Sequence, residues 1–125
     1  MGDPRHDFGR AAESIVDRWL IDTGWRVLER RWRVRDGELD LVCLDPADCL
    51  VGVEVRARRT ARSGSPLESL RARHVARLRT ALARYARDNA PPHRGIRIDL
   101  VSVRLKRRPG GTVVAIGRTA VTVAI

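Results

Sequence analysis

Two acidic residues on neighbouring predicted strands could together hold a divalent metal ion. The ranges 38–44 and 50–58 each favour a β-strand, and the turn residues at 45–48 between them predict an antiparallel hairpin. In the expected register Asp40 lies directly opposite Glu54, which brings their Cβ atoms to roughly 4.5–5.5 Å. Two carboxylates so close repel each other and call for a cation. Hard oxygen ligands suit magnesium or manganese rather than zinc.

The register of this hairpin follows from the pairing of Leu44 with Leu50 across the turn, which also places Glu38 opposite Arg56. Strand side chains alternate between the two faces of a sheet. One face of the first strand should therefore carry Leu39, Leu41 and Cys43, and the other Glu38, Asp40 and Val42. On the second strand one face should carry Val51, Val53, Val55 and Ala57, and the other Glu54, Arg56 and Arg58. On spacing alone, solvent-exposed charges or a register shifted by two residues explain the acids equally well.

Four motifs around these acids follow one another in a characteristic order. They are Gly9-Arg10-Ala11-Ala12-Glu13 at the start of a predicted helix, Gly37-Glu38-Leu39-Asp40-Leu41-Val42, Val53-Glu54-Val55-Arg56-Ala57-Arg58, and Arg97-Ile98-Asp99-Leu100-Val101. In order and spacing they resemble the YraN-like bacterial family of the PD-(D/E)xK nuclease superfamily, which is related to Holliday-junction resolvases. The resemblance covers about residues 9–105.

The resemblance implies a role for each acidic residue of these motifs. Asp40 and Glu54 would be the metal ligands, and Glu13 and Glu38 would be supporting acidic groups of the catalytic site. A family member of this kind would cut phosphodiester bonds with the help of Mg²⁺ or Mn²⁺.

The sequence departs from the family pattern at Arg56, where the family usually has the lysine of its E-x-K signature. A guanidinium stays protonated, so Arg56 cannot accept a proton, but it keeps a positive charge and offers a planar fork of donors to phosphate. Glu38 could hold that fork in place. His74 stands where a second family lysine is expected, although a lone histidine is more often a packed or surface residue. Asp99 is expected to be structural, with a supporting role at the site left open.

The charge of the chain is unevenly distributed and points to nucleic acid. Residues 1–55 hold eight arginines and twelve acids, whereas residues 56–108 hold sixteen basic residues and three acids, within a total net charge of +10. A biased genome would explain why 24 of the 25 basic residues are arginine, but it does not explain the excess of base over acid. We expect phosphate contacts rather than a merely solvated surface. The expected contact residues are Arg58, Arg59, Arg62, Arg71, Arg73, Arg77 and His74.

Length and composition fit one globular domain. The chain has 125 residues, of which 43% are hydrophobic and 32% charged. We expect residues 1–125 to form a single nuclease-like domain, with a core of about residues 9–105 and a β-rich tail over 106–125. Cys43 and Cys49 lack the spacing of a zinc or redox site. With no signal peptide and no apolar run near the roughly 20 residues of a membrane span, a soluble cytoplasmic protein is expected.

Hydrophobic periodicity predicts the order α-β-β-β-α-β for the core. The first helix should cover 10–23 and bury Ala12, Ile15, Val16, Trp19 and Leu20. A strand over 25–34, irregular near 28–29, should precede the hairpin. The second helix should start at the capping box 65–68 and end near 89, burying Leu67, Leu70, Val75, Leu78, Leu82 and Tyr85. A strand over 96–105, a basic turn over 106–111 and edge strands over 112–116 and 120–125 complete the chain. This is an α/β fold with a mixed central sheet flanked by helices, like the restriction-endonuclease-like core that the resemblance implies.

Two classes of function remain open. The first is a metal-dependent endonuclease acting on DNA or RNA, with the ion held by Asp40 and Glu54. The second is a nucleic-acid-binding module that kept the nuclease fold and cuts weakly or not at all; a basic structural protein is a distant third. No nucleotide cofactor is expected, because no glycine-rich phosphate loop follows a strand. Ser-His and Cys-His catalysis lack the necessary residues near the motif. A homodimer is suggested only by analogy with junction resolvases.

Overall fold

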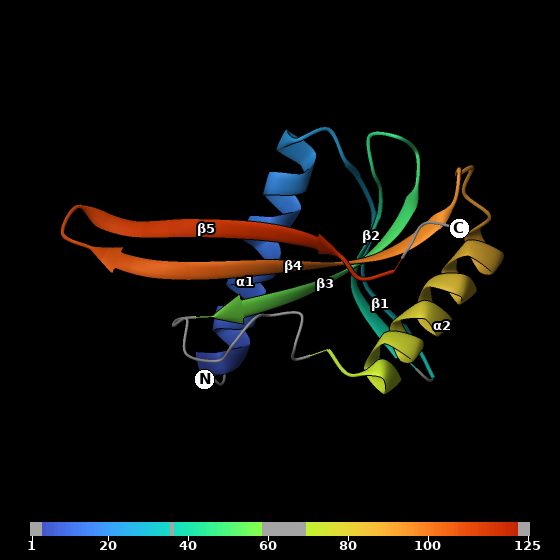
Figure 1. Cartoon of the computed structure of the whole chain (residues 1–125), viewed down its shortest axis with the longest axis horizontal. Helices are drawn as coiled ribbons and strands as arrows, with labels where there is room; N and C mark the ends of the chain where they lie inside the picture. The colour runs from blue at the N-terminus through green and yellow to red at the C-terminus, as the bar shows by residue number, and fades with distance from the viewer. Residues whose placement is uncertain (1–3, 36, 59–69, 123–125) are drawn as a thin grey trace.

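The predicted α/β class and element order are confirmed. The computed structural model describes residues 4–35, 37–58 and 70–122. The elements in chain order are α1 (Pro4–Asp22), β1 (Arg26–Val34), β2 (Gly37–Leu44), β3 (Leu50–Arg58), α2 (Ala72–Asn89), β4 (Ile96–Arg108) and β5 (Gly111–Ala120) (Figure 1). Residues 111–120 form the one strand β5, which contains the predicted edge strand over 112–116. Of the second predicted edge strand, over 120–125, Val121 and Thr122 lie after β5 and 123–125 lie outside the described residues.

The five strands form one mixed sheet in the order β1-β2-β3-β4-β5. β3 and β4 run parallel and the other neighbours run antiparallel, so α2 is the crossover between β3 and β4. Leu44 pairs with Leu50 as predicted, and this register continues to the pair of Leu41 and Val53. The irregularity predicted in β1 is a shift of register between Val27 and Glu29.

The two helices cover opposite faces of the sheet. Ala12, Val16 and Leu20 of α1 are fully buried against one face, which confirms the stripe predicted for this helix. The other face packs against Leu78, Ala81, Leu82 and Tyr85 of α2. Neither helix, within the described residues, is long and apolar enough to cross a membrane.

Both helices differ from their predicted limits at the N-terminal end. α1 begins at Pro4 rather than near residue 10, which is possible because proline is accepted in the first turn of a helix. α2 begins at Ala72, since Arg71 has an extended backbone with φ −80° and ψ 153°. The helical conformation predicted for Leu70 and Arg71 is therefore wrong, and the capping box at 65–68 lies outside the described residues.

The β4–β5 hairpin extends beyond the rest of the sheet as a two-stranded arm (Figure 1). β4 pairs with β3 as far as Arg104. Beyond Arg104, the only described strand that pairs with β4 is β5. The predicted basic turn over 106–111 is wrong in its first half, because Lys106 to Arg108 continue β4 and the turn is at 109–110. We call residues 105–114 the arm.

Candidate metal and nucleic-acid site

Asp40 and Glu54 come together where β2 and β3 separate. The paired ladder between these strands ends at Leu41 and Val53. Immediately beyond it, the Asp40 carboxylate accepts a hydrogen bond of 2.7 Å from the backbone N–H of Val55. The two acidic side chains are also hydrogen-bonded to each other. The structure therefore brings together the two residues that the sequence predicted as metal ligands, and we call them the carboxylate pair.

A change of face in β2 directs Asp40 toward β3. Leu41 packs on the α1 face, but Leu39 packs on the α2 face, so the prediction that they share a face is wrong. The reason lies in Gly52 on β3, where a Cβ atom would come within 2.9 Å of the Leu39 side chain. The missing side chain leaves the space that Leu39 fills. Asp40 occupies the point at which the strand changes face, and its carboxylate reaches the β3 backbone.

Burial and the neighbouring acid alter the protonation of the carboxylate pair. Burial, together with the hydrogen bond and the negative charge of Glu54, raises the pKa of Asp40 to about 8, against the opposing effect of the Val55 N–H. In the metal-free protein at neutral pH, the Asp40 carboxyl group is therefore mostly protonated. A divalent cation satisfies the same need for positive charge, so the donor set fits Mg²⁺ or Mn²⁺.

His74 and Arg56 are the further partners of Glu54, whose side chain is only 9% exposed. His74 Nε2 lies 2.5 Å from Glu54 Oε2, and Arg56 Nη2 lies 3.7 Å from the same oxygen. Burial and the positive charge of Arg56 lower the pKa of His74, so the neutral imidazole donates its Nε2 hydrogen to Glu54. Sequence reasoning gave His74 a phosphate contact and missed this role, because α2 brings it from a distant part of the chain.

Arg56 has an unused donor beside the carboxylate pair. Its Nε atom is buried and has no hydrogen-bond partner among the described residues. A buried donor without a partner is costly, so the Arg56 side chain is held beside the carboxylate pair at the expense of stability.

The two supporting acids have other partners. Glu38 forms an ion pair of 3.1 Å with Arg33, so the prediction that Glu38 holds the Arg56 side chain is wrong. The β2–β3 ladder ends before the two residues could pair, and Glu38 affects Asp40 only through its charge. Glu13 forms an ion pair of 3.2 Å with Arg31 and lies on α1, which covers the face of the sheet opposite α2. The ion pairs of Glu13 and Glu38 are thus made with arginines and not with residues of the carboxylate pair.

An open pocket of about 500 Å³ adjoins the carboxylate pair, and we call it the arginine pocket. Its lining residues are Arg33, Val34, Arg35, Gly37, Glu38, His74, Arg77 and Leu78. His74 connects the two features, because it lines the pocket and also contacts Glu54. Sequence reasoning missed Arg33 and Arg35 because they lie in the acidic half of the chain. The arginine-rich run 30–35 was the signal that could have revealed them.

Of the described arginines that were predicted to contact phosphate, one lines this pocket. Arg77 does so from α2, while Arg71 and Arg73 are exposed near the start of that helix and Arg58 is half-buried at the end of β3. Arg59 and Arg62 lie outside the described residues.

The protein supplies few ligands for an ion. The described residues contain no group of three or more His, Cys, Asp or Glu side chains that could bind a metal. A two-carboxylate site remains suitable for Mg²⁺, which usually keeps several waters and binds one or two protein carboxylates together with substrate phosphates.

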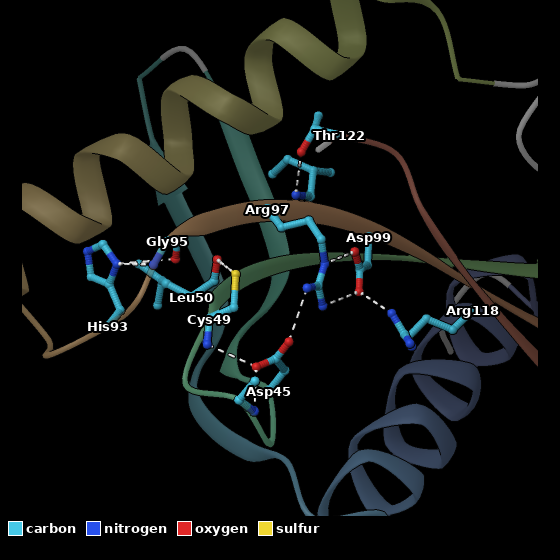
Figure 2. A network of polar contacts seen from close by, with 11 residues as sticks. Asp45, Cys49, Leu50, His93, Gly95, Arg97, Asp99, Arg118 and Thr122 are labelled. Atoms are coloured by element: carbon cyan, nitrogen blue, oxygen red, sulfur yellow. Dashed lines mark hydrogen bonds and ion pairs between the residues drawn. The ribbon is translucent and has the colours of Figure 1, made fainter. Parts of the chain in front are cut away.

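Asp99 belongs to a separate ionic network on the α1 face (Figure 2). The guanidinium group of Arg118 in this network lies over the ring of Trp25. Its carboxylate is fully buried and accepts hydrogen bonds of 2.7 and 3.0 Å from Arg97 and one of 2.8 Å from Arg118. Arg97 also forms an ion pair of 3.1 Å with Asp45 in the β2–β3 turn. These contacts join β4, β5 and the turn, and they give Asp99 a structural role.

Comparison with known proteins places the chain among a group of bacterial proteins of similar length. Residues 12–103 match the sequence profile of the uncharacterised protein family UPF0102. A UPF0102 protein of Nocardioides sp. is 42% identical over 106 residues, which cover 85% of this chain and 84% of the relative. One of Beutenbergia cavernae is 42% identical over 102 residues, covering 82% and 85%. One of Bifidobacterium longum subsp. infantis is 38% identical over 111 residues, covering 85% and 90%.

Proposed function

This chain belongs to the UPF0102 family, which the YraN-like motifs predicted, and from its site we propose that it is a metal-dependent endonuclease that binds DNA or RNA. The observation that carries the proposal is the buried carboxylate pair beside the arginine pocket. Opposed acids suit a cation and an arginine-lined pocket suits phosphate, so the two together suit a phosphodiester. We expect such a protein to act in the cytoplasm.

Asp40 and Glu54 would hold Mg²⁺ or Mn²⁺ in place of the proton that Asp40 carries in the metal-free protein. When bound, the ion activates water and neutralises the negative charge that develops on the phosphate. The Val55 N–H fixes the Asp40 carboxylate, and His74 orients Glu54. A ligand carboxylate whose position is fixed by a second hydrogen bond loses less freedom when it binds the ion.

Two groups of positive residues would position the substrate. Arg56, whose side chain is 36% exposed, would bind an oxygen of the phosphate at the carboxylate pair. Arg33, Arg35 and Arg77 would hold the neighbouring phosphate of the same strand in the arginine pocket. Contacts of this kind fix the register of the backbone but do not read sequence.

The test combines metal binding with cleavage. Calorimetry with Mn²⁺ should give one site in the wild type, and Asp40→Ala or Glu54→Ala should abolish it while the protein stays folded. Duplex, branched and single-stranded DNA and RNA, each with Mg²⁺ or Mn²⁺, should include a substrate that the wild type cuts and neither variant cuts. Asp22→Asn is the matched control, because it removes an exposed acid of α1 that pairs only with Arg18 in the described structure.

The outcomes separate the possible functions. Equal Mn²⁺ affinity in the wild type and both alanine variants would reject the metal site. Nucleic-acid binding without cleavage of any substrate would identify a binding module, and the absence of both activities would reject the proposal.

A further inference from the structure

The outer edge of β5 is open along its whole length. β5 is the last strand of the sheet, and no described strand pairs with its outer side. Nearly all its residues are exposed, including Val113 at 51% and Val114 at 42%. An exposed edge presents a row of backbone N–H and C=O groups that can pair with another strand.

The other free edges of the sheet carry several charges, whereas β5 has a single charged residue, Arg118, near its C-terminal end. β1, at the opposite edge, has four arginines and one glutamate among its nine residues. In the arm, β4 carries Lys106, Arg107 and Arg108. The segment Gly111–Gly117 of β5 contains no charged residue and no proline, although 32% of the chain is charged. Charges and prolines on an edge prevent pairing with other chains, so this is the one described edge that lacks such protection.

We propose that β5 is a dimer interface, in which the β5 strands of two copies of this chain pair antiparallel about a two-fold axis at Val114. We call Gly111–Gly117 the uncharged segment. Val114 lies at its centre, and the residues on the two sides of Val114 are similar in type. The symmetric register pairs Gly111 with Gly117, Thr112 with Ile116, and Val113 with Ala115. A two-fold interface needs a surface that is complementary to itself, and this segment meets that condition over its whole length.

The surroundings of β5 favour a second copy over nucleic acid. Phosphate binding requires cations, and the uncharged segment has none, while the basic residues of the arm lie on β4 on its other side. On the α1 face of the arm, a groove of about 530 Å³ is lined by Phe8, Leu105, Arg107 and Thr112. Leu105 pairs with Val114, so the groove lies beside the proposed axis and offers room to side chains of the second copy.

The size and charge of this interface predict its behaviour. One pair of strands buries less surface than the roughly 1,200 Å² of a stable complex, so the dimer should be weak and depend on concentration. Each copy carries a net charge of +10, and salt screens the repulsion between them. Dimerisation should therefore strengthen as salt rises, whereas nucleic-acid binding should weaken.

Sedimentation over a range of protein and salt concentrations tests the proposal directly. The wild type should show a monomer–dimer equilibrium, and Val114→Lys should raise its dissociation constant by at least about tenfold, because two lysines would meet at the axis. Ile21→Lys is the matched control: it changes an apolar residue of α1 that is 46% exposed and should leave the equilibrium unchanged. A strictly monomeric wild type, or equal effects of both substitutions, would overturn the proposal.

A disulfide test fixes the register. A cysteine at Val114 would face its own copy across the axis, at a Cα separation of about 4.5–5.5 Å that allows a disulfide. The native Cys43 and Cys49 are free and buried, so they should not form cross-links between copies. Mild oxidation should cross-link Val114→Cys into a dimer much faster than Ile21→Cys. Equal rates for the two variants would contradict pairing at β5, and a cysteine at Val114 that remains monomeric would contradict this register.

Discussion

At the scale of single residues, the two members of the carboxylate pair have different partners. Asp40 accepts a hydrogen bond from the Val55 N–H, whereas Glu54 contacts the side chains of His74 and Arg56. Asp40 is thus the member whose charge can be removed with the least disturbance, because an asparagine at this position keeps an acceptor for Val55 and gains a donor for Glu54.

We expect Asp40→Asn to remove a pH dependence of stability. The raised pKa means that the folded protein keeps a proton on Asp40 that the unfolded chain, with an ordinary pKa of 3.8, releases. The metal-free wild type should therefore lose stability as pH rises from about 4 to about 8. Thermal unfolding in EDTA at several pH values should show this slope in the wild type and a smaller one in Asp40→Asn. Identical slopes would show that Asp40 does not carry this proton.

Arg56, which stands in place of the family lysine, should limit the rate of turnover. A lysine places a compact charge at the end of a flexible chain and has no equivalent of the buried Nε atom that lacks a partner. We expect Arg56→Lys to raise metal-dependent cleavage by about tenfold. Arg56→Ala should lower both cleavage and binding. Single-turnover assays with a substrate that the wild type binds would measure these changes, and no gain from lysine on any substrate would favour a binding module.

The core of the site was predictable from sequence, but its surroundings were not. The Asp40–Glu54 pairing follows from a short turn and a regular alternation of apolar residues, both of which are local features. His74 reaches Glu54 from the helix after β3, and Arg33 reaches Glu38 from the strand before it. The His74 contact depends on how α2 packs across the sheet, which local spacing does not specify, whereas Arg33 meets Glu38 as its partner in the β1–β2 ladder.

At the scale of elements, α2 packs very closely against the start of β2. A Cβ atom on Gly37 would come within 2.5 Å of the backbone oxygen of Arg77. Gly37 therefore sets the distance between the strand that carries Asp40 and the helix that carries His74. The predicted start and end points of the strands and helices do not reveal this contact, because they say nothing about which helix packs against Gly37.

Gly37→Ala should separate α2 from β2 and disturb the site. We expect a loss of about 1–3 kcal/mol in unfolding free energy, which is typical of forced overpacking. Affinity for nucleic acid should also fall, since Arg77 and His74 would move. Gly110→Ala is the control, because a Cβ atom there would meet nothing within 4 Å. Urea denaturation and binding assays would measure both effects, and equal stability of the two variants would contradict this role of Gly37.

The Asp99 network should be a main source of stability for the C-terminal strands. In Asp99→Asn, Arg97 and Arg118 would keep their charges but lose the buried anion between them. Breaking a buried pair of this kind costs about 3–5 kcal/mol. Asp88→Asn, which removes a surface acid of α2, should cost less than about 1 kcal/mol. Denaturant titration would compare the two, and a small loss for Asp99→Asn would mean that Asp45 alone satisfies Arg97.

The order of the helices and strands was predictable from hydrophobic periodicity, but the residues at which several of them begin or end were not. The stripe of α1 and the register of β2 with β3 between Leu44–Leu50 and Leu41–Val53 are repeated signals over several residues, and both were predicted correctly. The start of α2 was misplaced because a capping pattern and an apolar spacing predicted a helix where Arg71 is extended. The arm was missed because a basic run followed by proline and glycines looks like a turn, although its first half continues β4.

At the scale of the whole molecule, the charge of +10 should govern binding to nucleic acid. Each phosphate that is neutralised contributes about −0.9 to the slope of log K against log salt on duplex DNA. A variant with Arg33→Gln and Arg77→Gln should reduce the magnitude of this slope by about one to two. Arg84→Gln and Arg87→Gln, near the end of α2, form the matched control. Binding that does not respond to salt would contradict an electrostatic interface.

The single parallel junction of the sheet has a consequence for how the chain folds. β1, β2 and β3 are joined by short turns, so this three-stranded meander can form from local contacts. β4 can join only after the whole segment between β3 and Ile96 has been brought round, since Ile96 pairs with Leu50 far earlier in the chain. Closing a long loop before its contacts form is the slow step in such topologies. The carboxylate pair should thus assemble early, and His74 should reach Glu54 only when β4 docks and completes the native state.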